Sequence, residues 1–187
     1  MNGDAIYAFF ERLATLVTPE TELHYNSPLD LTVAVILSAQ STDAMVNRAT
    51  RALFTRCRTA EDYLALGEEG LISHIRTLGL YQRKAQSVIG LCRILVDQYQ
   101  GRIPETREEL EALPGVGRKT AGVLLNALFG QPTLAVDTHV FRVANRMGMV
   151  VGHTPEATEQ ALLKVVPAAF LKDAHHYLLL HGRYVCK

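Results

Sequence analysis

The sequence predicts an all-α protein, arranged as two helical lobes. Three observations favour this class: helix-start signals recur along the chain, apolar residues recur at intervals of three and four, and the two-residue alternation of β-strands is nearly absent. We therefore expect about ten helices and no sheet in the 187 residues.

The predicted helices follow one another from the first residue onward. Residues 1–17 (MNGDAIYAFFERLATLV) carry charged side chains within an apolar pattern, which favours an amphipathic helix over a signal peptide or a membrane span. A serine or threonine favours a helix start where its side chain can accept a hydrogen bond from the first helical turn. Such residues predict further starts at Ser27, Thr59, Thr106 and, more weakly, Thr154.

Two short apolar runs, VAVIL (33–37) and TLAV (133–136), are the candidates for β-strands. The first lies inside a capped helical pattern and the second is very short, so neither predicts a sheet. Gly130-Gln131-Pro132 ends the helix before the second run. We place the one domain boundary there, which predicts a central lobe and a second lobe formed by both termini, residues 22–131 and residues 1–21 plus 132–187.

Composition and charge limit the function classes. Apolar residues make up 48% of the chain and charged residues 20%, as in an ordinary globular protein. Because 19 Lys and Arg balance 19 Asp and Glu, any contact with nucleic acid must come from local groups rather than from long-range attraction. Three widely spaced cysteines indicate a reducing compartment, so we expect a cytoplasmic protein that does not associate with membranes.

The stretch LPGVGRKTA (113–121) lies between two predicted helices. Pro114 stops the first helix, and Gly115 and Gly117 allow positive φ and the close approach of another molecule to the backbone. Val116 can turn inward between them as an apolar plug. The following helix presents its first amide groups outward, which binds a phosphate without net positive charge. For the P-G-x-G part alone, a tight turn with no ligand is an alternative.

Lys119 lies in the first turn of the helix that follows these glycines. The helix dipole and the neighbouring Arg118 both disfavour a cation there. A lysine amine is a nucleophile only when neutral, and its ordinary pKa of about 10.4 keeps it charged, so this placement favours activation for covalent chemistry. Simple contact with a phosphate is the alternative. Asp137 is a predicted helix N-cap. A carboxylate in that position can also assist proton transfer or stabilise a cationic sugar.

Residues 113–146 (LPGVGRKTAGVLLNALFGQPTLAVDTHVFRVANR) resemble the core signature of the endonuclease III family of DNA glycosylases. The similarity extends to ILSAQSTD (36–43), LGLYQRKA (78–85) and HGRY-x-C (181–186), so it covers nearly the whole chain. It implies the helix-hairpin-helix DNA glycosylase fold, with the hairpin over residues 106–129 and a cleft between the two lobes.

The resemblance implies a bifunctional DNA glycosylase/AP lyase that excises oxidised pyrimidines from double-stranded DNA in base excision repair. Lys119 would attack C1′, expel the base and form a Schiff base from which β-elimination cleaves the strand, with Asp137 as its catalytic partner. Gln40 and Leu80 match residues that fill the gap left by the extruded base. The other residues expected to contact damaged or abasic DNA are Tyr81, Arg83, Lys84, Gly115, Val116, Gly117, Arg118, Thr120 and His139. For Arg83 and Lys84, a solvated surface is the alternative.

The chain departs from the family at its cysteines. Family members follow HGRY-x-C with three more cysteines that ligate a [4Fe–4S] cluster, whereas here Cys186 is followed only by Lys187. One cysteine cannot hold such a cluster, so the residues present support no cofactor, and Cys186 would be a ligand only in a longer chain. The resemblance also implies a monovalent cation on the hairpin carbonyls. Four histidines lack the spacing of a metal site, and we expect structural or DNA-facing roles for His139, His175, His176 and His181.

Two other functions remain open. A monofunctional mismatch or adenine glycosylase works by attack of water, and such enzymes lack a lysine at this hairpin position, so Lys119 speaks against that function. A non-catalytic helix-hairpin-helix module would use the hairpin only as a phosphate clamp and would release no base. In each case we expect a monomer.

Overall fold

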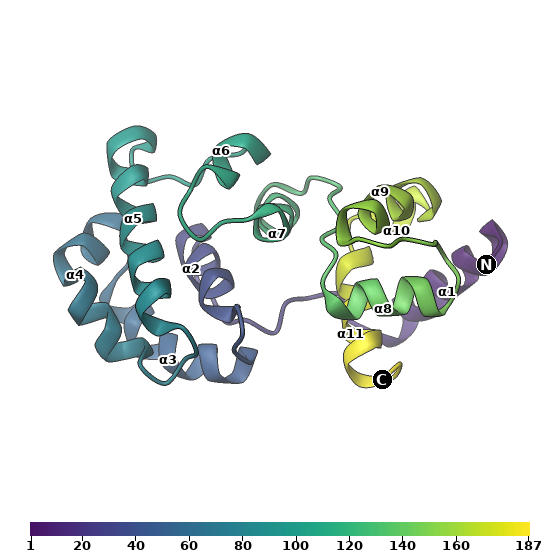
Figure 1. Cartoon of the computed structure of the whole chain (residues 1–187), viewed down its shortest axis with the longest axis horizontal. Coiled ribbons are helices and arrows are strands. Elements are labelled where there is room, and N and C mark those ends of the chain that lie inside the picture. Colours follow the sequence, from purple (N-terminus) through teal and green to yellow (C-terminus); the bar gives the residue numbers. More distant parts are fainter. The chain divides into compact units, whose positions relative to one another are not determined.

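The computed structural model describes residues 1–187 and contains eleven α-helices and no strand. The all-α class predicted from the sequence is therefore confirmed. The chain divides into two compact units, and the helices of each are labelled in Figure 1. We call residues 22–124 the central unit, and residues 1–21 with 125–187 the terminal unit.

The central unit is organised around a buried apolar helix. Its elements are α2 (Pro28–Ser38), α3 (Asp43–Arg56), α4 (Ala60–Ile75), α5 (Tyr81–Tyr99), α6 (Arg107–Glu111) and the first half of α7 (Arg118–Phe129). Helix α2 packs against α3 and α5, while α4 pairs with α5. Because nearly every residue of α2 is buried, its VAVIL run is apolar all round, as expected of a core helix. This run is helical and forms no strand.

Side-chain caps start the helices where the sequence predicts them. Ser27 Oγ accepts a hydrogen bond from the Asp30 amide at 3.0 Å, and Pro28 occupies the first helical position. Thr59 forms a reciprocal capping box with Asp62. Thr106 and Thr154 cap α6 and α9 (Pro155–Val165) in the same way. All four predicted starts are confirmed.

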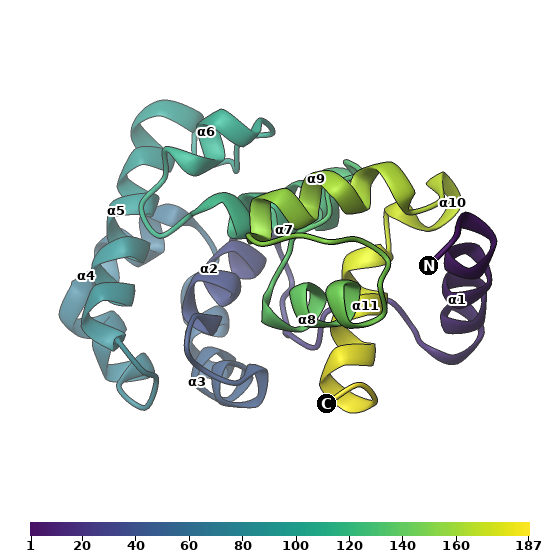
Figure 2. The same cartoon turned by 45° about the vertical axis from the view of Figure 1, so that its right-hand side comes forward.

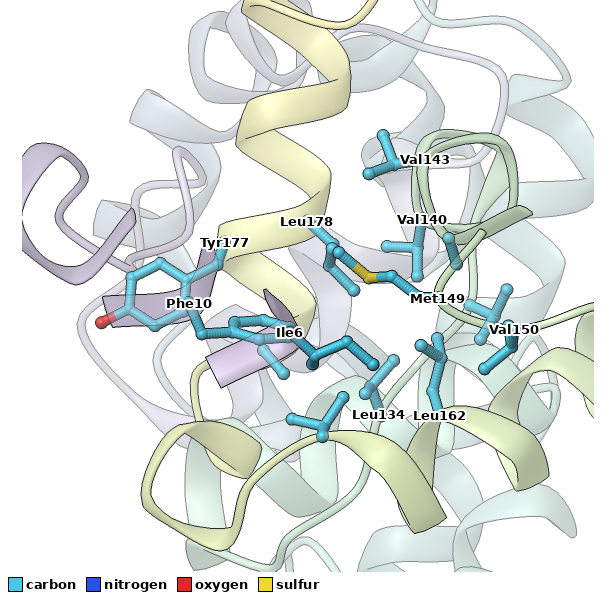
Figure 3. Packing of buried hydrophobic residues seen from close by; sticks show 14 of the residues in the cluster. Ile6, Phe10, Leu134, Val140, Val143, Met149, Val150, Leu162, Tyr177 and Leu178 are labelled. Carbon is cyan, nitrogen blue, oxygen red and sulfur yellow. The ribbon is translucent and has the colours of Figure 1, made fainter. Parts of the chain in front are cut away.

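The terminal unit brings the two ends of the chain onto one core. It contains α1 (Gly3–Leu16), the end of α7, α8 (Thr138–Arg146), α9, α10 (Ala168–Leu171) and α11 (Ala174–Tyr184). Helix α11 packs against both α8 and α1 (Figure 2). Figure 3 shows Ile6 and Phe10 of α1 beside Tyr177 and Leu178 of α11, within a cluster of buried side chains that also includes Leu134. The TLAV run is an extended connection rather than a strand.

Helix α7 ends where the sequence predicts. Gly130 has φ +64°, its amide donates to Asn126 O at 3.0 Å, and the Gln131 amide donates to Leu125 O at 3.1 Å. The division between the units lies within α7, between Leu124 and Leu125, and not after residue 131. The end of α7 belongs to the terminal unit because Asn126 Nδ2 donates to Lys172 O at 2.7 Å. None of the eleven helices is long and apolar enough to cross a membrane.

Candidate nucleic-acid interface and catalytic residues

The hairpin between α6 and α7 is held tightly on its inner side. Leu113 and Val116 are buried, and the Val116 amide donates to Leu113 O at 3.1 Å. Gly115 has φ +80°, and a Cβ there would lie 2.9 Å from Ser87 Cβ and 3.2 Å from Ile36 Cγ2. Only glycine fits this position. Val116 is therefore the inward plug that the sequence predicts.

The outer side of the hairpin is open. Gly117 does not have positive φ, so of the two glycines only Gly115 uses the left-handed region. A Cβ at Gly117 would meet nothing within 4 Å. Its carbonyl accepts from the Ala121 amide at 2.9 Å and so begins the bonding of α7. The open side and the bare backbone leave room for another molecule to approach at Gly117.

Lys119 lies in the first turn of α7, which contains no acidic residue. Arg118 and Lys119 are exposed and Thr120 is half-buried, so two cations are presented at the helix start beside Gly117. Arg107 of α6 links the two helices of the hairpin, because its guanidinium donates to Arg118 O of α7 at 3.2 Å. The same guanidinium pairs with Glu111 within α6 at 3.4 Å. The Lys119 amine thus extends from a backbone that Arg107 holds on its N-terminal side.

Asp137 caps α8 in the terminal unit. Its Oδ1 accepts from the Val140 amide at 2.8 Å, and the side chain is half-buried. One oxygen is thereby used in the cap, while the other is left for a second partner. The predicted N-cap role is confirmed.

The loop that leads to Asp137 is fixed by two buried polar side chains. Asn126 Nδ2 donates to Lys172 O at 2.7 Å, to Thr133 O at 3.2 Å and to Gln131 O at 3.3 Å. Buried His175 bonds through Nδ1 to Ala135 O at 2.7 Å, which means that this nitrogen carries the proton. Sequence patterns predict no role for Asn126 and only a general one for His175, since neither bond follows from local spacing.

Gln40 and Leu80 share an unusual backbone conformation. Both are exposed non-glycine residues with left-handed φ, +53° for Gln40 and +57° for Leu80. Gln40 follows α2, and Leu80 immediately precedes α5. Left-handed residues of this kind are rare and concentrate at functional sites. No glycine or asparagine marks these positions in the sequence, so the conformation could not be predicted.

The cations beside Leu80 differ in exposure. Arg83 is exposed and Tyr81 half-buried, which leaves both able to reach a ligand. Lys84 is only 4% exposed, and its Nζ donates to Ser41 Oγ at 3.0 Å. Burial lowers the pKa of Lys84. The sequence predicted a phosphate contact or a solvated surface for Lys84, and the structure instead places its amine inside the central unit, because Ser41 supplies an internal partner.

Two further predicted residues, His139 and Cys186, belong to the terminal unit. His139 is half-buried beside Arg142, and Arg142 donates to Gly182 O at 2.7 Å and to Cys186 O at 2.8 Å. Cys186 is half-buried. The other two cysteines, Cys57 and Cys92, are buried in the central unit.

Known proteins resemble this chain in sequence and in fold. Residues 33–168 match the HhH-GPD superfamily of base excision DNA repair proteins. Endonuclease III of Rickettsia conorii is 56% identical over 169 residues, which are 90% of this chain and 80% of the relative. Endonuclease III of Escherichia coli strain K12 is 55% identical with the same coverage, and that of Treponema pallidum is 49% identical over the whole chain and 89% of its own length.

Solved structures agree with the sequence relatives. A trapped endonuclease III–DNA covalent intermediate matches the whole chain with a TM-score of 0.93 and 41% identity, over 89% of that protein. A non-covalent endonuclease III–DNA complex matches with a TM-score of 0.94 and 41% identity, over 88% of its chain. A thermostable thymine-DNA glycosylase at 23% identity and a TM-score of 0.81 shares the fold. The chain therefore belongs to the endonuclease III family of base excision repair DNA glycosylases, within the HhH-GPD superfamily.

Proposed function

We propose that this protein is a bifunctional DNA glycosylase/AP lyase that removes oxidised pyrimidines from double-stranded DNA, with Lys119 as its nucleophile. The observation that carries the proposal is the placement of Lys119. It is an exposed amine in the first turn of α7, next to the open face of Gly117, on a hairpin that Gly115 and Val116 fix to the central unit. The first turn of α7, which carries both Arg118 and Lys119, contains no acidic residue.

The hairpin supplies the grip on DNA. A backbone phosphate can approach the bare backbone at Gly117 and the positive end of the α7 dipole, with Arg118 adding a local positive charge. This contact needs no net positive charge on the protein, which fits a chain with formal net charge +0. Carbonyl oxygens of the same turn would hold a monovalent cation, as the family resemblance implies.

The proposed chemistry proceeds through an imine. Nζ of neutral Lys119 bonds to C1′ while the bond from C1′ to the base breaks, and the base leaves with that electron pair and gains a proton. Opening of the sugar ring gives the Schiff base. Loss of a proton from C2′ then breaks the C3′–O bond, and the phosphate on the 3′ side leaves with that electron pair as the 5′ end of the downstream strand. Hydrolysis returns the free amine.

Asp137 and the two left-handed residues assist in different ways. The free oxygen of the Asp137 carboxylate would stabilise positive charge that develops on the sugar and carry protons between steps. Gln40 and Leu80 would enter the duplex where the damaged base has left the stack, which offsets part of the unstacking energy.

We propose that the protein acts as a monomer on chromosomal DNA in the cytoplasm.

Borohydride trapping tests the proposal. The protein is incubated with a duplex that carries thymine glycol or an abasic site, and the mixture is then reduced. We expect a covalent adduct with wild-type protein and none with Lys119→Gln, while Lys119→Gln still binds the duplex. Base release by Lys119→Gln at the wild-type rate would show that water, and not this lysine, is the nucleophile. Binding by wild-type protein without adduct or base release would leave only a phosphate clamp.

A further inference from the structure

The loops that carry Gln40 and Leu80 touch each other inside the central unit. A Cβ at Gly79 would lie 3.2 Å from Gln40 O, closer than most side-chain contacts allow. The backbone before Leu80 thus lies against the backbone of Gln40. Since both residues are exposed and left-handed, two rare conformations occur side by side.

Lys84 is bonded to both loops. Its backbone amide donates to Leu80 O at 3.0 Å and so forms the first hydrogen bond of α5. Its side chain reaches in the other direction, where Nζ donates to Ser41 Oγ at 3.0 Å. Ser41 directly follows Gln40, and its own amide donates to Ser38 O at 3.1 Å. One residue thereby connects the residue after Gln40 with Leu80 itself.

The buried position of the Lys84 ammonium lowers the stability of the fold. A lysine that is 4% exposed has lost most of its hydration, and a neutral hydroxyl is its hydrogen-bond partner here. Buried charges without an opposite charge are costly. An apolar residue of similar length would fill the same space on α5 without that cost. A buried lysine at this position is therefore better explained by what it holds in place.

We propose that Lys84 is a positioning residue that locks the Gln40 and Leu80 loops in one arrangement, so that both side chains enter the DNA duplex together. The inference rests on the proposed function, in which Gln40 and Leu80 fill the gap left by the extruded base. Lys84 would hold the Gln40 loop through the bond of its Nζ to Ser41, and the Leu80 loop through the bond of its backbone amide to Leu80 O. Lys84 touches neither the base nor the sugar.

The test uses DNA that requires gap filling but no chemistry. A duplex carries a tetrahydrofuran abasic analogue with 2-aminopurine in the opposite strand, and the fluorescence of 2-aminopurine reports insertion of protein side chains beside it. We compare Lys84→Met, which keeps an apolar stem and removes the ammonium, with Ser41→Ala, which removes its partner. Val88→Ala is the control, since Val88 is fully buried on the same helix and contacts neither loop through a hydrogen bond.

We expect Lys84→Met to lose half or more of the wild-type fluorescence change while the protein still binds the duplex. Base release from a thymine glycol duplex should slow by about tenfold, whereas cleavage of a single-stranded abasic substrate, which has no gap to fill, should change by less than about twofold. Ser41→Ala should reproduce both results. The double variant should be no worse than Lys84→Met, because both changes remove the same bond.

A purely structural role for Lys84 would give a different pattern. Activities on the duplex and on the single-stranded substrate would then fall together. Val88→Ala, if it lowered the melting temperature as much as Lys84→Met, would also lose as much of the fluorescence change and of the base release. Full fluorescence change in Lys84→Met would also overturn the proposal. The proposed function fails separately, through absence of a borohydride adduct in wild-type protein, because the fluorescence measurement needs no covalent step.

Discussion

Gly115→Ala tests whether the hairpin is fixed to the central unit as the structure shows. Two effects oppose an alanine here. The left-handed conformation at φ +80° costs an L-residue about 1–2 kcal/mol, and forcing a methyl group into a packed site costs about 1–3 kcal/mol. The new Cβ would lie 2.9 Å from Ser87 Cβ and 3.2 Å from Ile36 Cγ2, and neither atom is the end of a flexible chain. Reduced freedom of the unfolded chain offsets about 0.4–1 kcal/mol.

The free energy of unfolding should therefore fall by about 1–4 kcal/mol in Gly115→Ala. Urea denaturation followed by circular dichroism measures this as a lower transition midpoint. With a slope of about 1–3 kcal/mol per M, the midpoint should fall by about 1 M, and the slope itself should stay unchanged.

Gly117→Ala is the matched control, two residues away in the same turn. Its Cβ would meet nothing within 4 Å and its φ is not positive, so the loss of stability should stay below about 1 kcal/mol. Its affinity for duplex DNA should fall, because the methyl group covers backbone that a phosphate would approach. If Gly115→Ala were no less stable than Gly117→Ala, the described packing of the hairpin against α2 and α5 would be incorrect.

Three further predictions concern parts outside the hairpin. Asn126→Ala should lower the free energy of unfolding by about 1–3 kcal/mol in urea denaturation, because three backbone carbonyls lose their donor; wild-type stability would refute this role. Thr59→Ala removes the cap of α4 and should cost about 1 kcal/mol in thermal melting, and Thr55→Ala, whose hydroxyl bonds only within α3, is its control. Burial lowers the pKa of His176, and the negative charges of Asp173 and Glu20 offset this only in part. The unfolded chain therefore binds a proton at this histidine more readily than the folded protein, and the free energy of unfolding should fall as the pH drops below about 6.5. His176→Gln should flatten this dependence in melts between pH 7 and pH 5, and an equally steep curve would contradict it.

Local chemistry made much of the fold predictable. Four helices are capped by the side chain of the residue that predicts their start, namely Ser27, Thr59, Thr106 and Thr154. The hydrogen bond that makes these residue types a helix-start signal is the bond that the structure contains. The hairpin was equally readable, since Val116 has to turn inward where Gly115 lets the chain reverse. Both features depend on residues within a few positions of each other.

The features that the sequence did not reveal depend on contacts between distant segments. The partner of Lys84 is Ser41, 43 residues away, and the partner of His175 is Ala135, 40 residues away. A cation on a helix beside an arginine predicts a surface position, and only the packing of the two loops shows otherwise. The left-handed φ of Gln40 and Leu80 is likewise set by the loops around them, because neither residue type favours it.

The most direct test of the central claim is to identify the residue that carries the sugar after borohydride reduction. Wild-type protein is trapped on an abasic duplex and digested with a protease, and the modified peptide is located by mass spectrometry. We expect a single adduct at Lys119, in the peptide that contains the start of α7. An adduct at another amine, such as Lys84 or the N-terminus, with Lys119 unmodified would contradict the assignment of the nucleophile.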